Sequence, residues 1–273
     1  MLQTPTSDDI IGWCRQALRF MLPADCIGCG LLLGSDPVPF FCRLCWKNIV
    51  PLNGPACISC DQPFVSPAAT SHTPDHHCQS CMERPPAYDR ARTLFPYLPP
   101  LQDAICAFKY RGKYALANPL ANLMIRALTP EITADLILPV PLHPTRLRAR
   151  EYNQSLLLAD RIGRHLHVPV SPSAMVRLLA TDPQTTLSRQ ERLRNLRQAF
   201  SLRHPDAIAG KRILLIDDVY TTGTTVNECA KVLKKAGAAS VLALTLARTI
   251  ETNLIPDRIL AEQSQRSLPA LGF

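Results

Sequence analysis

The sequence predicts an α/β protein in which helices flank a parallel sheet and a small cysteine-rich module precedes that sheet. Short apolar runs, each followed by a polar loop and a helical stretch, are typical of strands buried on both faces of a parallel sheet. Four Cys-x-x-Cys pairs in the first third of the chain offer thiolates at the spacing of zinc knuckles. The 273 residues suffice for one sizeable core and a small zinc-ribbon module.

We expect four segments along the chain. Residues 1–22 form an N-terminal amphipathic helix, 23–85 a double zinc ribbon, 86–250 the α/β domain and 251–273 a tail. The first helix should pack on the protein itself, because its polar face has too little basic charge for a membrane surface. No apolar run reaches the roughly 20 residues of a membrane span, and no signal-peptide pattern is present. These features predict a cytoplasmic protein.

The cysteine pairs predict two four-sulfur metal sites, because two pairs complete a tetrahedral set of thiolates. A reducing cytoplasm disfavours disulfides, so structural zinc is favoured, with an iron–sulfur cluster as the alternative. Spacing alone leaves a crossed pairing open, and His72, His76 and His77 lie near enough to compete as ligands. The expected ligands, in sequential sets, are Cys26, Cys29, Cys42 and Cys45, and then Cys57, Cys60, Cys78 and Cys81.

Prolines between Pro85 and Pro100 mark a joint between the modules, and basic and aromatic residues alternate between Ile105 and Tyr114. Such residues can stack on bases and neutralise phosphates, which is the chemistry of single-stranded nucleic-acid binding. Lys109 and Arg111 are therefore candidate nucleic-acid contacts. A core-edge strand or a turn with solvated lysines fits the pattern equally well.

Positive charge is concentrated after this region. The formal net charge is +8, and the segment from residue 143 to 203 contains 11 arginines, no lysine and 4 acids. Arginine favours bidentate recognition of phosphate, so these residues could serve a pyrophosphate, a polyphosphate backbone or both. Within it, residues 181–197 predict either a mobile flap that closes over a pyrophosphate or a helix with a solvated basic face.

Three segments predict buried strands, at residues 135–140, 212–216 and 240–248. The first leads into a loop at residues 141–146 and a helix at residues 153–166. Ligands collect at the carboxyl ends of such strands, so this loop is a candidate anion site.

The strongest motif follows the second of these strands. Asp217 and Asp218 come directly after it, and a Thr/Gly loop at residues 221–225 precedes a helix predicted for residues 226–236. This order places backbone N–H groups and a helix N-terminus at the end of a strand, where they suit a phosphate.

A carboxylate pair would repel a phosphate, but it suits the hydroxyls of a sugar whose phosphate lies in the loop, with a metal nearby. A solvated Asp-Asp turn with a Thr-rich cap is the simpler alternative. A P-loop ATPase is set aside because the chain has no Gly-x-x-x-x-Gly-Lys-Ser/Thr motif.

This segment closely resembles the ribose-5-phosphate motif of the type I phosphoribosyltransferases, which bind 5-phosphoribosyl-1-pyrophosphate (PRPP). The resemblance implies a type I phosphoribosyltransferase-like parallel sheet, in which Asp217 and Asp218 are the catalytic residues and meet the ribose hydroxyls. It also implies magnesium with PRPP, and pyrophosphate at residues 141–146. The implied PRPP contacts are Leu142, His143, Arg146, Arg192, Thr221, Thr222, Gly223, Thr224 and Thr225.

Together, the segments resemble the ComF family, including its GntX-like members, over nearly the whole chain. Besides the cysteine pairs and the carboxylate motif, the markers are Phe108 to Gly112, Val140 to His143, Arg150 to Gln154, and Gln184, Leu187, Arg192 and Asn195. The family usually has Arg-Gly-Phe-Asn-Gln where this chain has Glu151 and Tyr152, so we expect a glycine-dependent turn to be altered there.

The family resemblance implies a bacterial cytoplasmic protein of natural competence, which assists DNA uptake and the handling of single-stranded DNA. The implied partners are PRPP, single-stranded DNA, and a DNA-uptake helicase or other competence proteins. Two functions stay open: a PRPP-binding protein without turnover, and an active magnesium-dependent phosphoribosyltransferase with a base or amine acceptor.

Overall fold

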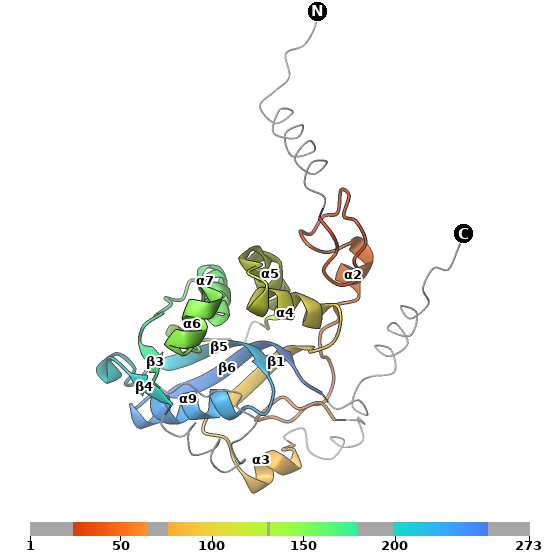
Figure 1. Cartoon of the computed structure of the whole chain (residues 1–273). Coiled ribbons are helices and arrows are strands. Elements are labelled where there is room, and N and C mark those ends of the chain that lie inside the picture. Colours follow the sequence, from red (N-terminus) through yellow and green to blue (C-terminus); the bar gives the residue numbers. More distant parts are fainter. Residues whose placement is uncertain (1–23, 65–75, 130–131, 179–198, 251–273) are drawn as a thin grey trace, which may run out of the picture.

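The computed structural model describes residues 24–64, 76–129, 132–178 and 199–250 (Figure 1). Their centre is a parallel four-stranded sheet in the order β1, β6, β5, β2. The short strands β3 and β4 form a separate antiparallel pair. The strand bounds are β1 Arg90–Pro96, β2 Leu136–Pro139, β3 Met175–Arg177, β4 Phe200–Leu202, β5 Arg212–Tyr220 and β6 Ser240–Arg248.

Helices cover both faces of the sheet (Figure 1). Helices α4, α5 and α7 pack on one face around Phe108, and α9 packs on the other face around Leu233. Leu214 and Leu215 of β5 belong to different clusters, because successive strand residues point to opposite faces. The helix bounds are α2 Arg43–Lys47, α3 Gln79–Glu83, α4 Leu101–Tyr110, α5 Ala117–Ala127, α6 Pro144–Arg150, α7 Gln154–Leu166 and α9 Thr224–Lys235, with 3-10 turns η2 Tyr114–Leu116 and η3 Pro205–Ala207.

Two groups of four cysteines lie on opposite faces of this domain. The first group includes α2 and joins the core on the α4 side, whereas the second includes α3 and joins the core on the α9 side. Within each group all Sγ atoms lie within 4.8 Å of one another, and neither group includes a histidine among the described residues. The structure therefore has the sequential pairing, and the two groups fit a double zinc ribbon. The first cluster is Cys26, Cys29, Cys42 and Cys45, and the second cluster is Cys57, Cys60, Cys78 and Cys81.

The three predicted strands are confirmed as β2, β5 and β6, but the alternative of a strand or turn at residues 105–110 is wrong. The proline-rich joint contains β1, an edge strand of the sheet. Residues 105–110 belong to α4 instead of a strand or turn, because Leu101, Ala104 and Phe108 form part of one buried helical stripe.

Some predictions concern residues outside the described ranges. These are the amphipathic helix at residues 1–22, the flap or helix at residues 181–197 with Arg192, and the tail at residues 251–273. Within the described ranges, no helix has the length and apolar character needed to cross a membrane.

Candidate functional site

The candidate site lies where β5 ends and α9 begins. The strand continues through both carboxylates as far as Tyr220, so Asp217 and Asp218 stand on a rigid strand that is paired with β6. A turn of three residues then leads into α9, which starts at Thr224. The first N–H groups of this helix have no partners within it, so their donors and the helix dipole favour an anion in front of the turn.

Gly223 makes the tight turn possible. Its φ of 71° lies in the left-handed region, and it caps the N-terminus of α9. A Cβ atom at this position would lie 2.1 Å from the hydroxyl oxygen of Tyr220, so a side chain would be both strained and in collision. The hydroxyl oxygens of Thr222 and Thr224 lie 2.7 Å apart beside it. The Thr/Gly loop therefore presents hydroxyl and backbone donors close together.

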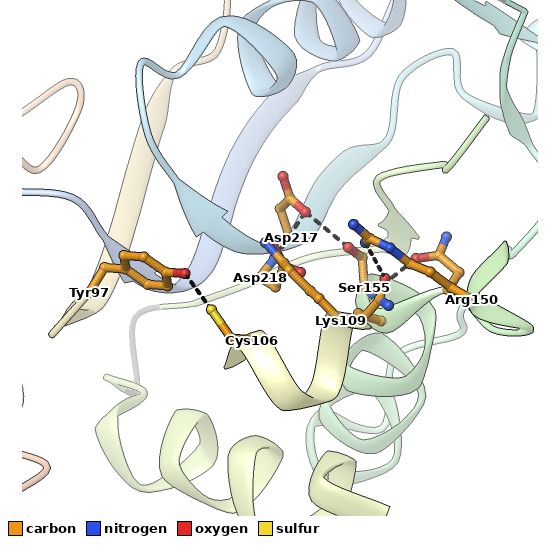
Figure 2. A network of polar contacts seen from close by, with 9 residues as sticks. Tyr97, Cys106, Lys109, Arg150, Ser155, Asp217 and Asp218 are labelled. Atoms are coloured by element: carbon orange, nitrogen blue, oxygen red, sulfur yellow. Dashed lines mark hydrogen bonds and ion pairs between the residues drawn. The ribbon is translucent and has the colours of Figure 1, made fainter. Parts of the chain in front are cut away.

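Two side chains from other elements hold the carboxylates (Figure 2). The Lys109 Nζ atom at the end of α4 lies 2.8 Å from Asp218 Oδ1. The Ser155 hydroxyl in α7 donates to Asp217 Oδ1 at 2.9 Å, and the backbone N–H of Asp218 donates to the same oxygen at 2.9 Å. The arrangement thus offsets the repulsion between two adjacent carboxylates without moving them apart.

The titration behaviour follows from this geometry. Burial, and then the charge of Asp218, raise the pKa of Asp217 to about 7. Burial disfavours the charge of Lys109, but the neighbouring carboxylates of Asp218 and Asp217 outweigh it and raise the pKa of the ammonium group. Lys109 is therefore charged at neutral pH and neutralises part of the carboxylate pair.

The structure separates the two residues predicted to contact nucleic acid. The Lys109 side chain is 17% exposed and is directed to Asp218, whereas Arg111 lies beyond the end of α4 and is exposed. Tyr110 and Tyr114 are 71% and 67% exposed, and the Arg150 guanidinium lies 4.8 Å from the ring centre of Tyr110. Exposed rings and arginines thus lie next to the site, while Lys109 belongs to it.

The segment at residues 141–146 is only partly a loop. Pro144 occupies the first turn of α6, and the His143 side chain caps that helix by accepting a hydrogen bond from Thr145 N at 3.3 Å. The Asn153 side chain caps α7 and donates to Val140 O at 3.1 Å. Because Val140 directly follows β2, this bond ties the end of β2 to the start of α7. Ser155 is therefore held beside Asp217, a contact for which the sequence contains no local signal.

A layer of side chains behind the Thr/Gly loop connects it to the second cluster. The Tyr220 hydroxyl lies 2.8 Å from that of Tyr88, and the Arg248 guanidinium lies 4.9 Å from the centre of the Tyr220 ring. Arg248 also donates to Cys60 O at 2.7 Å and to Gln62 Oε1 at 2.5 Å. Because Tyr220 packs against Gly223, the second cluster supports the turn that forms the site.

Backbone N–H groups also support the two clusters themselves. Cys42 N donates to Cys26 Sγ at 3.3 Å, and Cys78 N donates to Cys57 Sγ at 3.2 Å. Such bonds stabilise thiolates, and four thiolates at one point suit a tetrahedral zinc ion. The chemistry of the donors therefore fits structural zinc in both clusters.

Comparisons with known proteins agree with this geometry. A family model described as the phosphoribosyl transferase domain matches residues 153–260, which include both carboxylates and the Thr/Gly loop. The DNA utilization protein YhgH of Escherichia coli (strain K12) is 37% identical over 190 residues, which cover 67% of this chain and 82% of that protein. Competence protein F of Haemophilus influenzae is 31% identical over 222 residues, which cover 77% of this chain and 97% of that protein. The chain belongs to the ComF family.

The ComF relationship extends to a third relative. Competence protein ComFC of Bacillus subtilis is 30% identical over 162 residues, which cover 58% of this chain and 64% of that protein.

Glu151, which stands where ComF proteins usually have glycine, adopts a φ of 68° and ends α6 in the left-handed region. The turn expected to change therefore keeps a glycine-like shape, at a backbone cost of about 1 kcal/mol.

Proposed function

We propose that this ComF protein binds PRPP at the carboxyl end of β5 and assists the uptake and handling of single-stranded DNA. The observation that carries the proposal is the Thr/Gly loop with Gly223 at its φ of 71°, placed between two held carboxylates and the N-terminus of α9. The 5′-phosphate would occupy the loop, where donors converge. The ribose hydroxyls would meet Asp217 and Asp218.

Lys109 would act in this site as a charge partner. In the free protein it neutralises Asp218 at 2.8 Å. A bound magnesium ion would use oxygen ligands, and carboxylates together with substrate phosphates are the set that it prefers. Asp217 and Asp218 fit that role, and the cation would supply charge neutralisation for the pyrophosphate group. Lys109 would then be released to the ligand's own phosphates.

The pyrophosphate end of the ligand would face the segment at residues 141–146. Leu142 and His143 are partly buried there, and Arg146 begins the basic face of α6. Arg192 is assigned to the same group from the family motif. Neutral and positive groups of this segment would therefore meet the pyrophosphate.

The DNA part of the proposal rests on the relatives and on the surface beside the site. The named relatives are a DNA utilization protein and competence proteins. Tyr110, Tyr114 and Arg111 are exposed next to the carboxylates, and such rings and cations suit single-stranded DNA. Competence proteins such as a DNA-uptake helicase are the proposed partners, and the cytoplasm is the proposed compartment.

The test is calorimetric titration of magnesium-PRPP into the zinc-replete full chain and into an Asp217→Asn/Asp218→Asn variant. Pyrophosphate release is followed in the same samples, with candidate bases, amines and single-stranded DNA added in turn. Asp206→Asn serves as the matched control, because Asp206 is an exposed acid outside the site.

Each outcome decides a different part of the proposal. Saturable binding that the paired variant loses and the control keeps, without pyrophosphate release, supports a PRPP-binding role. Release that depends on one acceptor supports the alternative, an active phosphoribosyltransferase. Absence of PRPP binding to the unaltered protein would overturn the assignment of the Thr/Gly loop.

A further inference from the structure

A cavity of about 460 Å³ lies where the first cluster meets the α/β domain. Its walls come from α2 and the residues after it, from the edge strand β1, and from the last turn of α5. None of its lining residues belongs to the carboxylate pair, the Thr/Gly loop or Lys109. We call it the ribbon cavity, and its volume is in the range of small-molecule sites.

The charged side chains that line the ribbon cavity are all positive. Lys47, Arg92 and Arg126 line it from three different elements, and no acidic side chain is among the lining residues. The Arg92 Nη1 atom forms an ion pair with Asp61 Oδ1 at 3.2 Å, so part of the charge of Arg92 is already neutralised. In the part of the chain that the structure describes, neither Lys47 nor Arg126 forms an ion pair. Three cations from separate elements around one cavity therefore favour an anionic ligand.

Besides the three cations and a few uncharged polar residues, the lining has an apolar part that contains an indole ring. Trp46 is partly buried and packs against Phe41, with ring centres 5.2 Å apart, so its position is fixed. Leu52 and Leu123 line the cavity with it. A fixed aromatic ring beside cations is the combination that stacks a base and neutralises its phosphate.

We propose that the ribbon cavity binds a nucleotide, with the base against Trp46 and the phosphate between Lys47, Arg92 and Arg126. The site is separate from the proposed PRPP site and does not depend on PRPP binding. Its ligand is either a free nucleotide or one nucleotide unit of single-stranded DNA, because both present the same base and phosphate.

Trp46 provides the signal for the test. Trp13 and Trp46 are the tryptophans of the chain, so Trp13→Phe in the full-length, zinc-replete protein leaves Trp46 as the reporter. The fluorescence of Trp46 is titrated with dAMP, with dTMP, with a short oligodeoxythymidylate and with inorganic pyrophosphate. We expect saturable quenching by the nucleotides or by the oligonucleotide.

Charge reversal identifies the site. Lys47→Glu and Arg126→Glu should each weaken binding about tenfold or more, because each removes a charged contact to phosphate. Arg43→Glu is the control, since Arg43 is exposed on the same helix but does not line the cavity. Zinc content and thermal unfolding verify that each variant is folded.

The remaining arms separate the sources of the ligand. Binding of mononucleotides supports a free nucleotide, and binding of the oligonucleotide alone supports a unit of DNA. Quenching should persist with Asp217→Asn/Asp218→Asn and in the presence of magnesium-PRPP, which distinguishes this site from the PRPP site. The proposal is wrong if Arg43→Glu weakens binding as much as Lys47→Glu does. It is also wrong if pyrophosphate binds as tightly as dAMP, or if no nucleotide or oligonucleotide quenches Trp46.

Discussion

The two four-cysteine clusters have the same donors, yet they are attached to the α/β domain in different ways. Besides packing into the core on the α9 side, the second cluster is attached through polar contacts: Arg248 donates to Cys60 O and Gln62, and Asp61 accepts from Thr93 N at 2.7 Å. The first cluster is attached largely through apolar packing, with Gly28 against Pro100 and Phe41 in the core on the α4 side. The same set of four cysteines is therefore joined to the α/β domain by different kinds of contact.

The difference shows that the cysteine spacing determines the donor set, whereas the neighbouring residues determine which part of the α/β domain each cluster contacts. Around the second cluster, hydrogen bonds join Cys60 and Gln62 to Arg248, whose guanidinium packs on the ring of Tyr220 beside Gly223. Around the first cluster, packing leaves the ribbon cavity beside Trp46. We therefore expect the second cluster, more than the first, to govern the proposed PRPP site. The ribbon cavity should depend on both clusters, because Asp61 beside Cys60 holds Arg92 and Thr93 in its wall.

The largest effect is expected from removing one ligand of each cluster. Cys60→Ser should remove one metal equivalent, destabilise the protein by at least about 4 kcal/mol and abolish PRPP binding, because the support of Gly223 is lost. Cys29→Ser should also remove one metal equivalent but leave PRPP affinity nearly unchanged. Metal analysis, denaturant unfolding and calorimetry measure these quantities. Equal loss of PRPP affinity in both variants would contradict the comparison.

A smaller effect is expected from the contact between the second cluster and β6. Arg248→Met leaves Cys60 O without its donor and should cost about 2 to 3 kcal/mol of unfolding free energy. The affinity for PRPP should fall with it, while zinc content stays at two equivalents per chain if the cysteines alone hold the metal. Arg90→Met on β1 is the control, since Arg90 is exposed. A normal PRPP affinity in Arg248→Met would exclude the proposed support.

For the first cluster, the matching change is Gly28→Ala. The added Cβ would lie 2.4 Å from Pro100 Cβ and 3.2 Å from Cys45 Sγ, so overpacking should cost about 1 to 3 kcal/mol. The change should alter Trp46 fluorescence and leave PRPP binding intact. In the control Gly34→Ala, the added Cβ atom would have no neighbouring atom within 4 Å, so the free energy of unfolding should not change. If Gly28→Ala weakens PRPP binding instead, the two clusters are not independent.

The smallest effect is expected from Tyr220→Phe, which removes the hydrogen bond to Tyr88 but keeps the ring against Gly223. Denaturant unfolding should show a loss of about 1 kcal/mol, and calorimetry should show little change in PRPP affinity. A double-mutant cycle with Tyr88→Phe isolates the hydrogen bond. A large loss of PRPP affinity would indicate that the hydroxyl, and not the ring, positions the loop.

Much of the fold was predictable because its signals are local. Apolar runs predicted β2, β5 and β6, and Gly237, with a φ of 82°, follows the end of α9 as a C′ glycine should. The region from residue 85 to 114 was not predictable in the same way. Its prolines suggested a joint and its charges a solvated surface, while burial of Phe108 and Ala104 decided in favour of a helix.

Residue types at short spacing were enough to predict the four Cys-x-x-Cys pairs as metal donors, the carboxylate pair and the turn at Gly223. The pairing of the cysteines into two groups became clear from the folded chain. The partners of the two carboxylates could not be predicted from the sequence. Lys109 lies on Asp218, and Ser155 lies on Asp217, although each pair is far apart along the chain. The physical reason is that burial and electrostatic pairing depend on which surfaces meet, and chain folding brings together residues that no local pattern relates.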